Sequence, residues 1–468
     1  MTLGMGTAAE GGAGEGSEGS GGLPAGWARA TLGELGVEVQ PGFASGKHNR
    51  DGDGIVHLRP MNITRNGAID LSDARYVMDE SDRRVEYGDV IFNNTNSPAL
   101  VGKTAWFGSL EPAAYSNHMT RLRGPEGLDS KFLAIQLHWL WASGYFKTVL
   151  NNHVNQASVA REVLLATWIV VPPHLEQMRI VAEVEQQMAR IGAGVVALGE
   201  AERQISLLEA TLLAVATKAH PDVAEWDSVT IEDMARVSSG ATPLKGNSAY
   251  YEGGTIPWVT SSLLNSPFIY HSDKFITEVA LRETAVKEYD PGTILVAMYG
   301  EGKTRGKCSE LRIRATTNQA CAAIQLHSEY ESRRGWLKAL LESLYEENRT
   351  LAAGGVQPNL SLSLIKKIRV PLPPMELQNK LLEDLAERRV QATAMAKTLA
   401  AAHAQAEDLR ASLLHAAFTG ALVPQDPADE PASVMLDRIR AAQGAKAPRK
   451  RAARKPRPTP PGQEELPS

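Results

Sequence analysis

The sequence predicts an α+β protein that contains two similar modules, each followed by one long helix. Three observations lead to this fold class. Short landmarks recur about 200 residues apart, the modules are rich in short β-prone runs, and apolar residues after each module follow heptad spacing. The 468 residues suffice for about two or three domains with their own cores. We therefore expect two modules in a pseudo-twofold arrangement, with the two helices forming an antiparallel coiled-coil spacer.

The repeat consists of landmarks that occur in the same order in both halves of the chain. Trp27 and Gly42 recur as Trp226 and Gly240. The other matches are Gly88-Asp-Val-Ile-Phe with Gly292-Thr-Ile-Leu-Val, Ser116-Asn117 with Thr317-Asn318, Val154-Asn155-Gln156 with Gly355-Val356-Gln357, Ile169-Val-Val-Pro-Pro with Val370-Pro-Leu-Pro-Pro, and Gln177 with Gln378. Because Asn117 and Asn318 fall at matched positions, we expect them to be structural.

The landmarks and the changes of composition set the predicted boundaries. These are a leader at 1–22, a first module at 23–173, a first long helix within 174–222, a second module at 223–374, a second long helix at 375–420, a C-terminal segment with a short helix at 421–442, and a basic tail at 443–468. The leader is rich in Gly, Ser and Glu, and the tail in Lys, Arg and Pro, so we expect both to be disordered.

After each pair of prolines the apolar residues follow alternating steps of three and four. These residues are Val181, Val184, Met188, Ile191, Val195, Leu198, Ile205 and Leu212 in the first helix, and Leu381, Leu385, Ala392, Met395, Leu399, Ala402, Ala406, Leu409, Leu413 and Ala416 in the second. About 45 residues at about 1.5 Å each make a rod of roughly 65–70 Å. Such a coil could simply dimerise the protein, but the duplicated module favours a spacer.

Composition limits the possible partners and sites. The net charge is −5, with 49 Lys and Arg against 54 Asp and Glu. The two modules are close to neutral, with 14 basic against 15 acidic residues at 24–170 and 17 against 16 at 226–370. Any nucleic-acid contact must therefore use a local patch. No apolar run is long enough for a membrane helix, and Cys308 and Cys321 are too few for a zinc site.

The sequence lacks the motifs of several enzyme classes. We find no phosphate loop, no Gly-x-Gly-x-x-Gly after a strand and no His-Glu-x-x-His. The Pro-Pro pairs follow Val171 and Leu372, whose side chains cannot accept the proton of an exocyclic amine as an amino-methyltransferase requires. The acidic cluster Asp70, Asp73, Asp79, Glu80 and Asp82 matches no ligand spacing and is typical of a solvated loop. We expect no catalytic centre and no metal site.

Several motifs together resemble the specificity subunits of Type I restriction–modification systems over roughly residues 23–440. They are Leu23-Pro-x-Gly-Trp27, Gly88-Asp-Val-Ile-Phe with Val101-Gly-Lys103, Pro172-Pro-His-Leu-Glu-Gln177 with Arg179-Ile-Val181, Gly240-x-Thr-Pro243, Ile256-Pro-Trp-Val259, Thr317-Asn-Gln-Ala320 and Ala417-Phe-Thr-Gly420 before Leu422-Val-Pro-Gln-Asp426. One departure is Leu377, which stands where the first repeat has Glu176; the adjacent Glu376 is a possible substitute.

The resemblance implies a non-catalytic, cytoplasmic subunit whose two modules are target-recognition domains for a bipartite, asymmetric double-stranded DNA sequence. It also implies that the helices, the central and distal conserved regions of the family, dock two methyltransferase subunits, and that restriction subunits join them. S-adenosylmethionine, ATP and Mg would then be cofactors of these partners, with none in this chain. The alternatives are a methylation-only or other defence complex, and a coiled-coil scaffold without a DNA role.

Residues that could contact DNA cluster in matched places of the two modules. The densest basic stretch of the second module holds Lys303, Arg305, Lys307, Arg312 and Arg314, and Arg and Lys suit guanine or phosphate. The corresponding place in the first module holds Asn93, Asn94, Asn96 and Lys103, and Lys47 and Arg50 lie in another loop. Asn suits adenine, but these asparagines equally fit turn chemistry, and the basic stretch equally fits a solvated hairpin.

We predict that replacing Lys303, Arg305 and Lys307 with Ala weakens specific DNA binding by the assembled complex and flattens its salt dependence, because phosphate contacts carry that dependence. Binding isotherms over a series of salt concentrations test this prediction. Unchanged affinity and an unchanged salt slope would contradict it.

Overall fold

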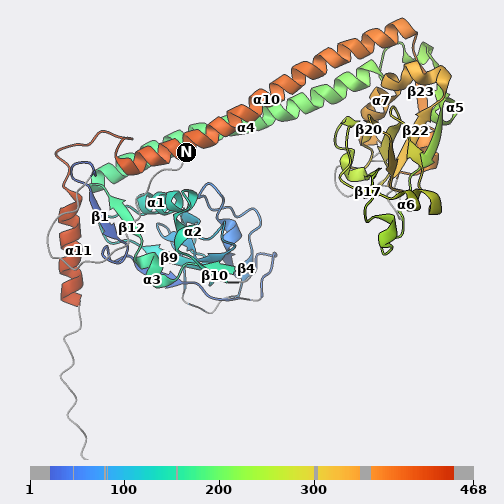
Figure 1. The fold of residues 1–468 in the computed structure, drawn as a ribbon. Helices are drawn as coiled ribbons and strands as arrows, with labels where there is room; N and C mark the ends of the chain where they lie inside the picture. Colours follow the sequence, from blue (N-terminus) through green and yellow to red (C-terminus); the bar gives the residue numbers. More distant parts are fainter. Residues whose placement is uncertain are drawn as a thin grey trace, which may run out of the picture. The chain divides into compact units, whose positions relative to one another are not determined.

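The structure is a computed structural model that describes residues 22–45, 47–78, 81, 83–153, 156–299, 304–347 and 360–446. The chain divides into two compact units, one of residues 1–194 and 405–468, the other of residues 195–404. Each unit holds one module of strands and helices together with segments of both long helices, α4 (His174–Ala216) and α10 (Met375–Thr419) (Figure 1). The predicted leader up to residue 21, the tail from residue 447 and the landmarks at 154–155 and 355–357 lie outside the described residues.

The module of the first unit consists of short strands and three helices. Its first strand, β1 (Ala28–Thr31), pairs antiparallel with its last, β12 (Trp168–Val171). The sheets between them have the orders β2 (Glu38–Pro41), β9 (Met119–Arg123), β5 (Val90–Asn93), β7 (Thr104–Trp106); β4 (Tyr76–Val77), β3 (Ile55–Leu58), β8 (Ala114–Tyr115); and β10 (Asn151–His153), β11 (Gln156–Ser158), β6 (Thr95–Asn96). The helices are α1 (Ser130–Ala142), α2 (Tyr145–Val149) and α3 (Arg161–Leu165), with a 3-10 turn at Pro60–Asn62.

The module of the second unit has the same plan. Its first strand, β13 (Asp227–Thr230), pairs antiparallel with its last, β23 (Arg369–Leu372). The sheets have the orders β14 (Ala235–Ser239), β22 (Cys321–Leu326), β19 (Ile294–Ala297), β20 (Cys308–Leu311), β16 (Phe268–Ile269); and β17 (Phe275–Ile276), β15 (Ile256–Val259), β21 (Ala315–Thr317), β18 (Glu288–Tyr289). The helices are α5 (Ile231–Met234), α6 (Glu278–Glu283), α7 (Arg334–Ser343) and α9 (Leu362–Lys366), with 3-10 turns at Val223–Glu225, Ser248–Tyr250, Ser261–Leu263 and Ser328–Arg333.

Equivalent strand pairs in the two modules share their direction and register. Val90 of β5 lies opposite Leu122, and Ile294 of β19 lies opposite Ile324, both antiparallel. The turns before β5 and β19 each need a glycine, because Gly88 and Gly292 have φ values of 92° and 94°, which other residues rarely adopt. The duplicated α+β module predicted from the sequence is therefore present in the structure.

The structure corrects one match in the predicted repeat. In the parallel pairs β3–β8 and β15–β21, Leu58 lies opposite Tyr115 and Val259 lies opposite Thr317. Tyr115 therefore corresponds to Thr317, one residue away from the predicted match of Ser116 with Thr317. The true equivalents, listed in order, are Ser116 with Asn318 and Asn117 with Gln319. The shared asparagine suggested the wrong register, because strand pairing and not residue identity defines equivalent positions.

A buried glutamine anchors the start of each long helix to its module. Gln177 is fully buried, donates to Pro172 O at 2.9 Å and accepts from Asp129 N at 2.8 Å. Gln378 is also fully buried, and its Oε1 accepts from Arg333 at 3.0 Å. A buried amide needs such partners, so the repeated glutamine holds the helix where the last strand ends.

The departure at Leu377 changes how the second helix begins. In the first unit, Trp27 Nε1 donates to the buried carboxylate of Glu176 at 3.0 Å. In the second unit, Glu376 is exposed and leaves that buried position to the half-buried Leu377. Trp226 packs instead on the ring of Trp336 at 5.9 Å. The expected substitution by Glu376 is therefore wrong, and an aromatic contact replaces the polar one.

Both long helices show the predicted periodicity within their units. In the first unit, Ile180 and Val184 of α4 share a buried cluster with Leu414 and Phe418 of α10. In the second unit, Glu202 of α4 lies 3.4 Å from His403 of α10. Most predicted heptad positions are buried or half-buried; the exceptions are Met395 and Leu409, which are both 55% exposed. Within the described residues, no helix is both long and apolar enough to cross a bilayer.

The C-terminal segment completes the core of the first module. Helix α11 (Ala432–Lys446) adds four buried apolar side chains to this core, and they are Ala432, Met435, Leu436 and Ile439. Arg179 of α4 forms an ion pair at 2.5 Å with Asp429, whose side chain is almost fully buried. The segment after α10 is therefore part of the first unit's fold.

We predict that Gly240→Ala destabilises the protein, because the added Cβ would lie 2.1 Å from the backbone oxygen of Thr317. Overpacking of this kind costs roughly 1–3 kcal/mol, and each kcal/mol lowers the Tm of a domain of this size by about 2–4 °C. Gly246→Ala is the matched control, since its Cβ meets nothing within 4 Å. Equal thermal unfolding curves for the two variants would show that the close approach at Gly240 is unimportant.

Candidate nucleic-acid interface

Two of the predicted basic residues of the second module lie on the turn between β19 and β20. Arg305 and Lys307 are half-buried, and Lys307 Nζ donates to Asn265 Oδ1 at 2.8 Å. The turn includes Gly306, whose φ of 83° favours glycine. Lys303 lies outside the described residues. The turn is a basic, partly accessible segment, and its contact with DNA stays a prediction.

The other two predicted basic residues of this module are paired with acidic groups. Arg312 lies 3.5 Å from Glu310 and 4.3 Å from the ring centroid of Phe268. Arg314 forms an exposed ion pair with Asp290 at 2.7 Å. Both guanidinium groups have neighbouring carboxylates that offset their charge, so they are weaker attractors of phosphate than the sequence pattern suggests.

In the first module, two predicted contacts face the interior. Asn93 is fully buried, and its Nδ2 donates to Leu100 O at 2.9 Å. Lys103 is 5% exposed and donates to Ile63 O. Burial, together with the nearby Arg65, lowers the pKa of Lys103. These two side chains cannot reach a duplex without a rearrangement, so we leave them out of the interface proposed below.

The neighbouring asparagines are hydrogen-bonded within the first module. Asn94 Oδ1 accepts from Thr120 Oγ1 at 3.1 Å, and Asn96 Oδ1 accepts from Ser97 N at 2.7 Å. Both side chains are half-buried. The bond of Asn96 is the turn chemistry that the sequence left open as an alternative to adenine recognition, whereas the bond of Asn94 joins two segments that are distant in the chain.

The loop with Lys47 and Arg50 lies beside a cluster of arginines. Lys47 is exposed, and Arg50 lies 3.3 Å from the carboxylate of Asp73. The same carboxylate lies 3.6 Å from Arg59 and 3.3 Å from Arg75. One aspartate therefore holds three guanidinium groups together, and the cluster keeps a positive charge. No group of ligands suited to a metal ion occurs among the described residues.

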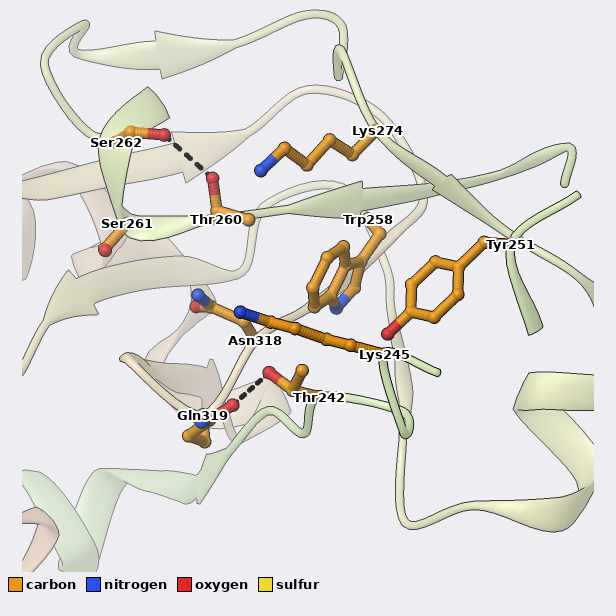
Figure 2. A pocket seen from close by; sticks show the side chains of 10 residues that line it. All are labelled: Thr242, Lys245, Tyr251, Trp258, Thr260, Ser261, Ser262, Lys274, Asn318 and Gln319. Atoms are coloured by element: carbon orange, nitrogen blue, oxygen red, sulfur yellow. Dashed lines mark hydrogen bonds between the residues drawn. The ribbon is translucent and has the colours of Figure 1, made fainter. Parts of the chain in front are cut away.

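The second module contains a polar hollow of about 490 Å³ that we did not predict from the sequence (Figure 2). Its walls come from the loop after β14, the ends of β15 and β21 and the start of β17. The lining residues are Thr242, Lys245, Tyr251, Trp258, Thr260, Ser261, Ser262, Lys274, Asn318 and Gln319. Asn318, which we expected to be structural, is among them.

The aromatic side chains of the hollow are held by backbone hydrogen bonds. Trp258 Nε1 donates to Ala241 O at 3.2 Å, and the hydroxyl of Tyr251 donates to Pro243 O at 2.6 Å. Burial raises the pKa of Tyr251, so its hydroxyl remains a neutral donor. The two rings contact edge to face at 6.0 Å. They form an aromatic wall beside the polar groups of the hollow.

The polar groups of the hollow can bind an anionic ligand that has hydrogen-bonding edges. The side chains of Lys245 and Lys274 extend on two sides of Trp258 (Figure 2). Gln319 accepts from Thr242, so the amide nitrogen of Gln319 stays available as a donor. Lysines suit phosphate, while amides and hydroxyls suit the edges of bases. A sequence signal existed in the motifs Gly240-x-Thr-Pro and Ile256-Pro-Trp-Val, but the residues come from segments far apart in the chain.

We predict that the double replacement of Lys245 and Lys274 with Ala weakens DNA binding by the assembled complex. The logarithmic salt slope should fall by about 2, because each phosphate contact contributes about 0.9. Lys287→Ala is the matched control, since this exposed lysine does not line the hollow. A salt slope that changes no more in the double variant than in the control would rule out phosphate contact at the hollow.

Comparisons with known proteins find one matching family model and several related sequences. Residues 224–387 match the family model of the Type I restriction modification DNA specificity domain. The chain is 29% identical over 160 residues to the MjaIX specificity subunit of Methanocaldococcus jannaschii, and 22% identical over 164 residues to the EcoR124I/EcoR124II specificity subunit of Escherichia coli. Each match covers 34% of this chain, and the matches span 36% and 40% of the two relatives.

Solved structures extend the likeness in fold to most of the chain. One, from work on complex assembly and conformational transition of the type I R-M system, has a TM-score of 0.68 at 22% identity and covers 86% of this chain and 99% of that chain. The HsdS subunit from Thermoanaerobacter tengcongensis has a TM-score of 0.50 at 23% identity, with coverage of 86% and 100%. By the matched domain, the related sequences and the shared fold, this chain is similar to the specificity subunits of Type I restriction–modification systems.

Proposed function

We propose that this chain is the non-catalytic subunit that gives a Type I restriction–modification complex its DNA sequence specificity. Each module would contact one half of a bipartite, asymmetric target in double-stranded DNA. The observation that carries the proposal is the presence of two modules with the same strand pairing in one chain. A second module of the same fold is needed to contact a second half-site, whereas dimerisation alone needs only one long helix.

The two long helices would form an antiparallel coiled coil that sets the spacing between the half-sites and relates the modules by a pseudo-twofold axis. Within the units, contacts between the helices support this arrangement. Val184, near the start of α4, clusters with Leu414, near the end of α10, while Glu202, further along α4, lies near His403. In antiparallel packing, the residue numbers of the contacting residues rise along one helix while they fall along the other.

The helices also offer a surface for partner subunits. In the second unit, a hollow of about 560 Å³ lies between segments of α4 and α10 and is lined partly by the exposed Leu208 and Met395. Exposed apolar side chains of this kind are typical of interaction sites. We propose that two methyltransferase subunits dock on the helices and that restriction subunits join the complex in the cytoplasm. S-adenosylmethionine, ATP and Mg would then act in these partners and not in this chain.

The decisive test is methylome sequencing of the host with and without the gene for this chain. We predict that a two-part adenine-methylation motif disappears on deletion and returns on complementation, because no other subunit of the complex would then specify the target. Persistence of every two-part motif after deletion would contradict the proposal. A scaffold without a DNA role would leave the methylome unchanged, and a methylation-only complex would lose the motif without any change in restriction of incoming DNA.

A further inference from the structure

Backbone hydrogen bonds define a site in the first module that is equivalent to the hollow of the second. Phe43 N donates to Tyr115 O at 3.1 Å, and Ala241 N donates to Thr317 O at 2.9 Å. Since Tyr115 and Thr317 are equivalent by strand register, the two loops begin at the same place. Four residues further on, each loop carries an exposed lysine; the two are Lys47 and Lys245.

A second pair of basic residues is related by the same register. His57 N donates to Arg75 O at 2.7 Å, and Trp258 N donates to Lys274 O at 2.8 Å. Arg75 is therefore the equivalent of Lys274, which lines the hollow. Both basic positions of the hollow have a basic counterpart in the first module, although neither module is basic overall.

Other positions of the site differ between the modules. By the same register, the pairs are Arg59 with Thr260, Ser116 with Asn318, Asn117 with Gln319 and Asp73 with Ser272. The change at the last pair has a direct consequence, because the carboxylate of Asp73 holds Arg59 and Arg75 at 3.6 and 3.3 Å. Ser272 instead donates to the backbone oxygen of Trp258 at 3.0 Å. The first module thus presents a fixed guanidinium where the second presents hydroxyls and amides.

We propose that both modules bind DNA through this one equivalent surface, with a division of labour between its positions. The exposed lysines, Lys47 in the first module and Lys245 and Lys274 in the second, bind the phosphate backbone. The positions that differ contact base edges and give the two half-sites different sequences. This inference rests on the proposed function and assigns its contacts. Arg59 would select a guanine in the first half-site, and Asn318 with Gln319 would select an adenine in the second.

The different roles of the phosphate contacts and the base contacts follow from what each can distinguish in the DNA. Phosphates are the same at every base pair, so their contacts position the protein without selecting a sequence. An arginine fork matches O6 and N7 of guanine, and a carboxamide matches N6 and N7 of adenine. Asp73 restrains Arg59 before DNA binds, which lowers the entropy lost on binding.

The test uses the complex of the full chain with its methyltransferase and reads the methylated motif and the salt dependence of binding. Arg59→Lys keeps the charge but loses the planar fork. We expect it to relax the guanine in the first half-site only, with an unchanged salt slope. Asn318→Ala should relax the second half-site only. Lys47→Ala should lower the salt slope by about 1 and leave the motif unchanged.

Thermal unfolding and co-purification with the methyltransferase show which variants are folded and assembled. The proposal is overturned if folded Arg59→Lys and Asn318→Ala complexes keep the wild-type motif, or if Lys47→Ala alters a base preference and not the salt slope. It is also overturned if one variant relaxes both half-sites equally. A wild-type complex without any two-part motif would instead contradict the proposed function, so the two failures are distinguishable.

Discussion

The antiparallel pairing of the first and last strand of each module is the constraint on which the rest of the structure depends. It brings the entry and exit of about 145 residues together, with Ala28 opposite Val171 in one module and Asp227 opposite Leu372 in the other. Two prolines then end the strand, and a buried glutamine holds the first turn of a long helix. Since ladder hydrogen bonds define this junction, side chains elsewhere in the module can change without moving the helix.

In the candidate interface, too, backbone contacts fix the positions of residues while the side chains can vary. Glycines at positions 42 and 240 let the loop pass within van der Waals distance of the carbonyls at the end of β8 and β21, where any Cβ would collide. The two loops therefore begin at the same place in both modules, while the side chains around them differ. An interface of this kind can acquire a new DNA preference by substitution alone, because its positions in space depend on backbone hydrogen bonds that do not involve the contacting side chains.

The fold was predictable from the sequence to a greater extent than the interface. The heptads and the repeated Pro-Pro pairs can be recognised in the sequence alone, because each reflects local backbone geometry. The hollow is different, since Lys245, Trp258 and Asn318 meet only after the sheets form. The asparagines at 93 and 94 show the converse difficulty: the amide of Asn93 donates to a backbone oxygen and that of Asn94 accepts from a threonine hydroxyl, and composition alone cannot distinguish such roles from base contact.

The overall negative charge is compatible with sequence-specific binding once the positions of the charges are known. Several basic groups form ion pairs with neighbouring carboxylates, as Arg314 does with Asp290 and Arg179 with Asp429. Pairing of this kind removes the general positive field that would hold the protein at any sequence. The lysines of the hollow and the arginines around Asp73 then supply attraction only where base edges can also be contacted. A nearly neutral module with a local basic site should therefore lose more affinity at a wrong sequence than a uniformly basic one, and specificity depends on that difference.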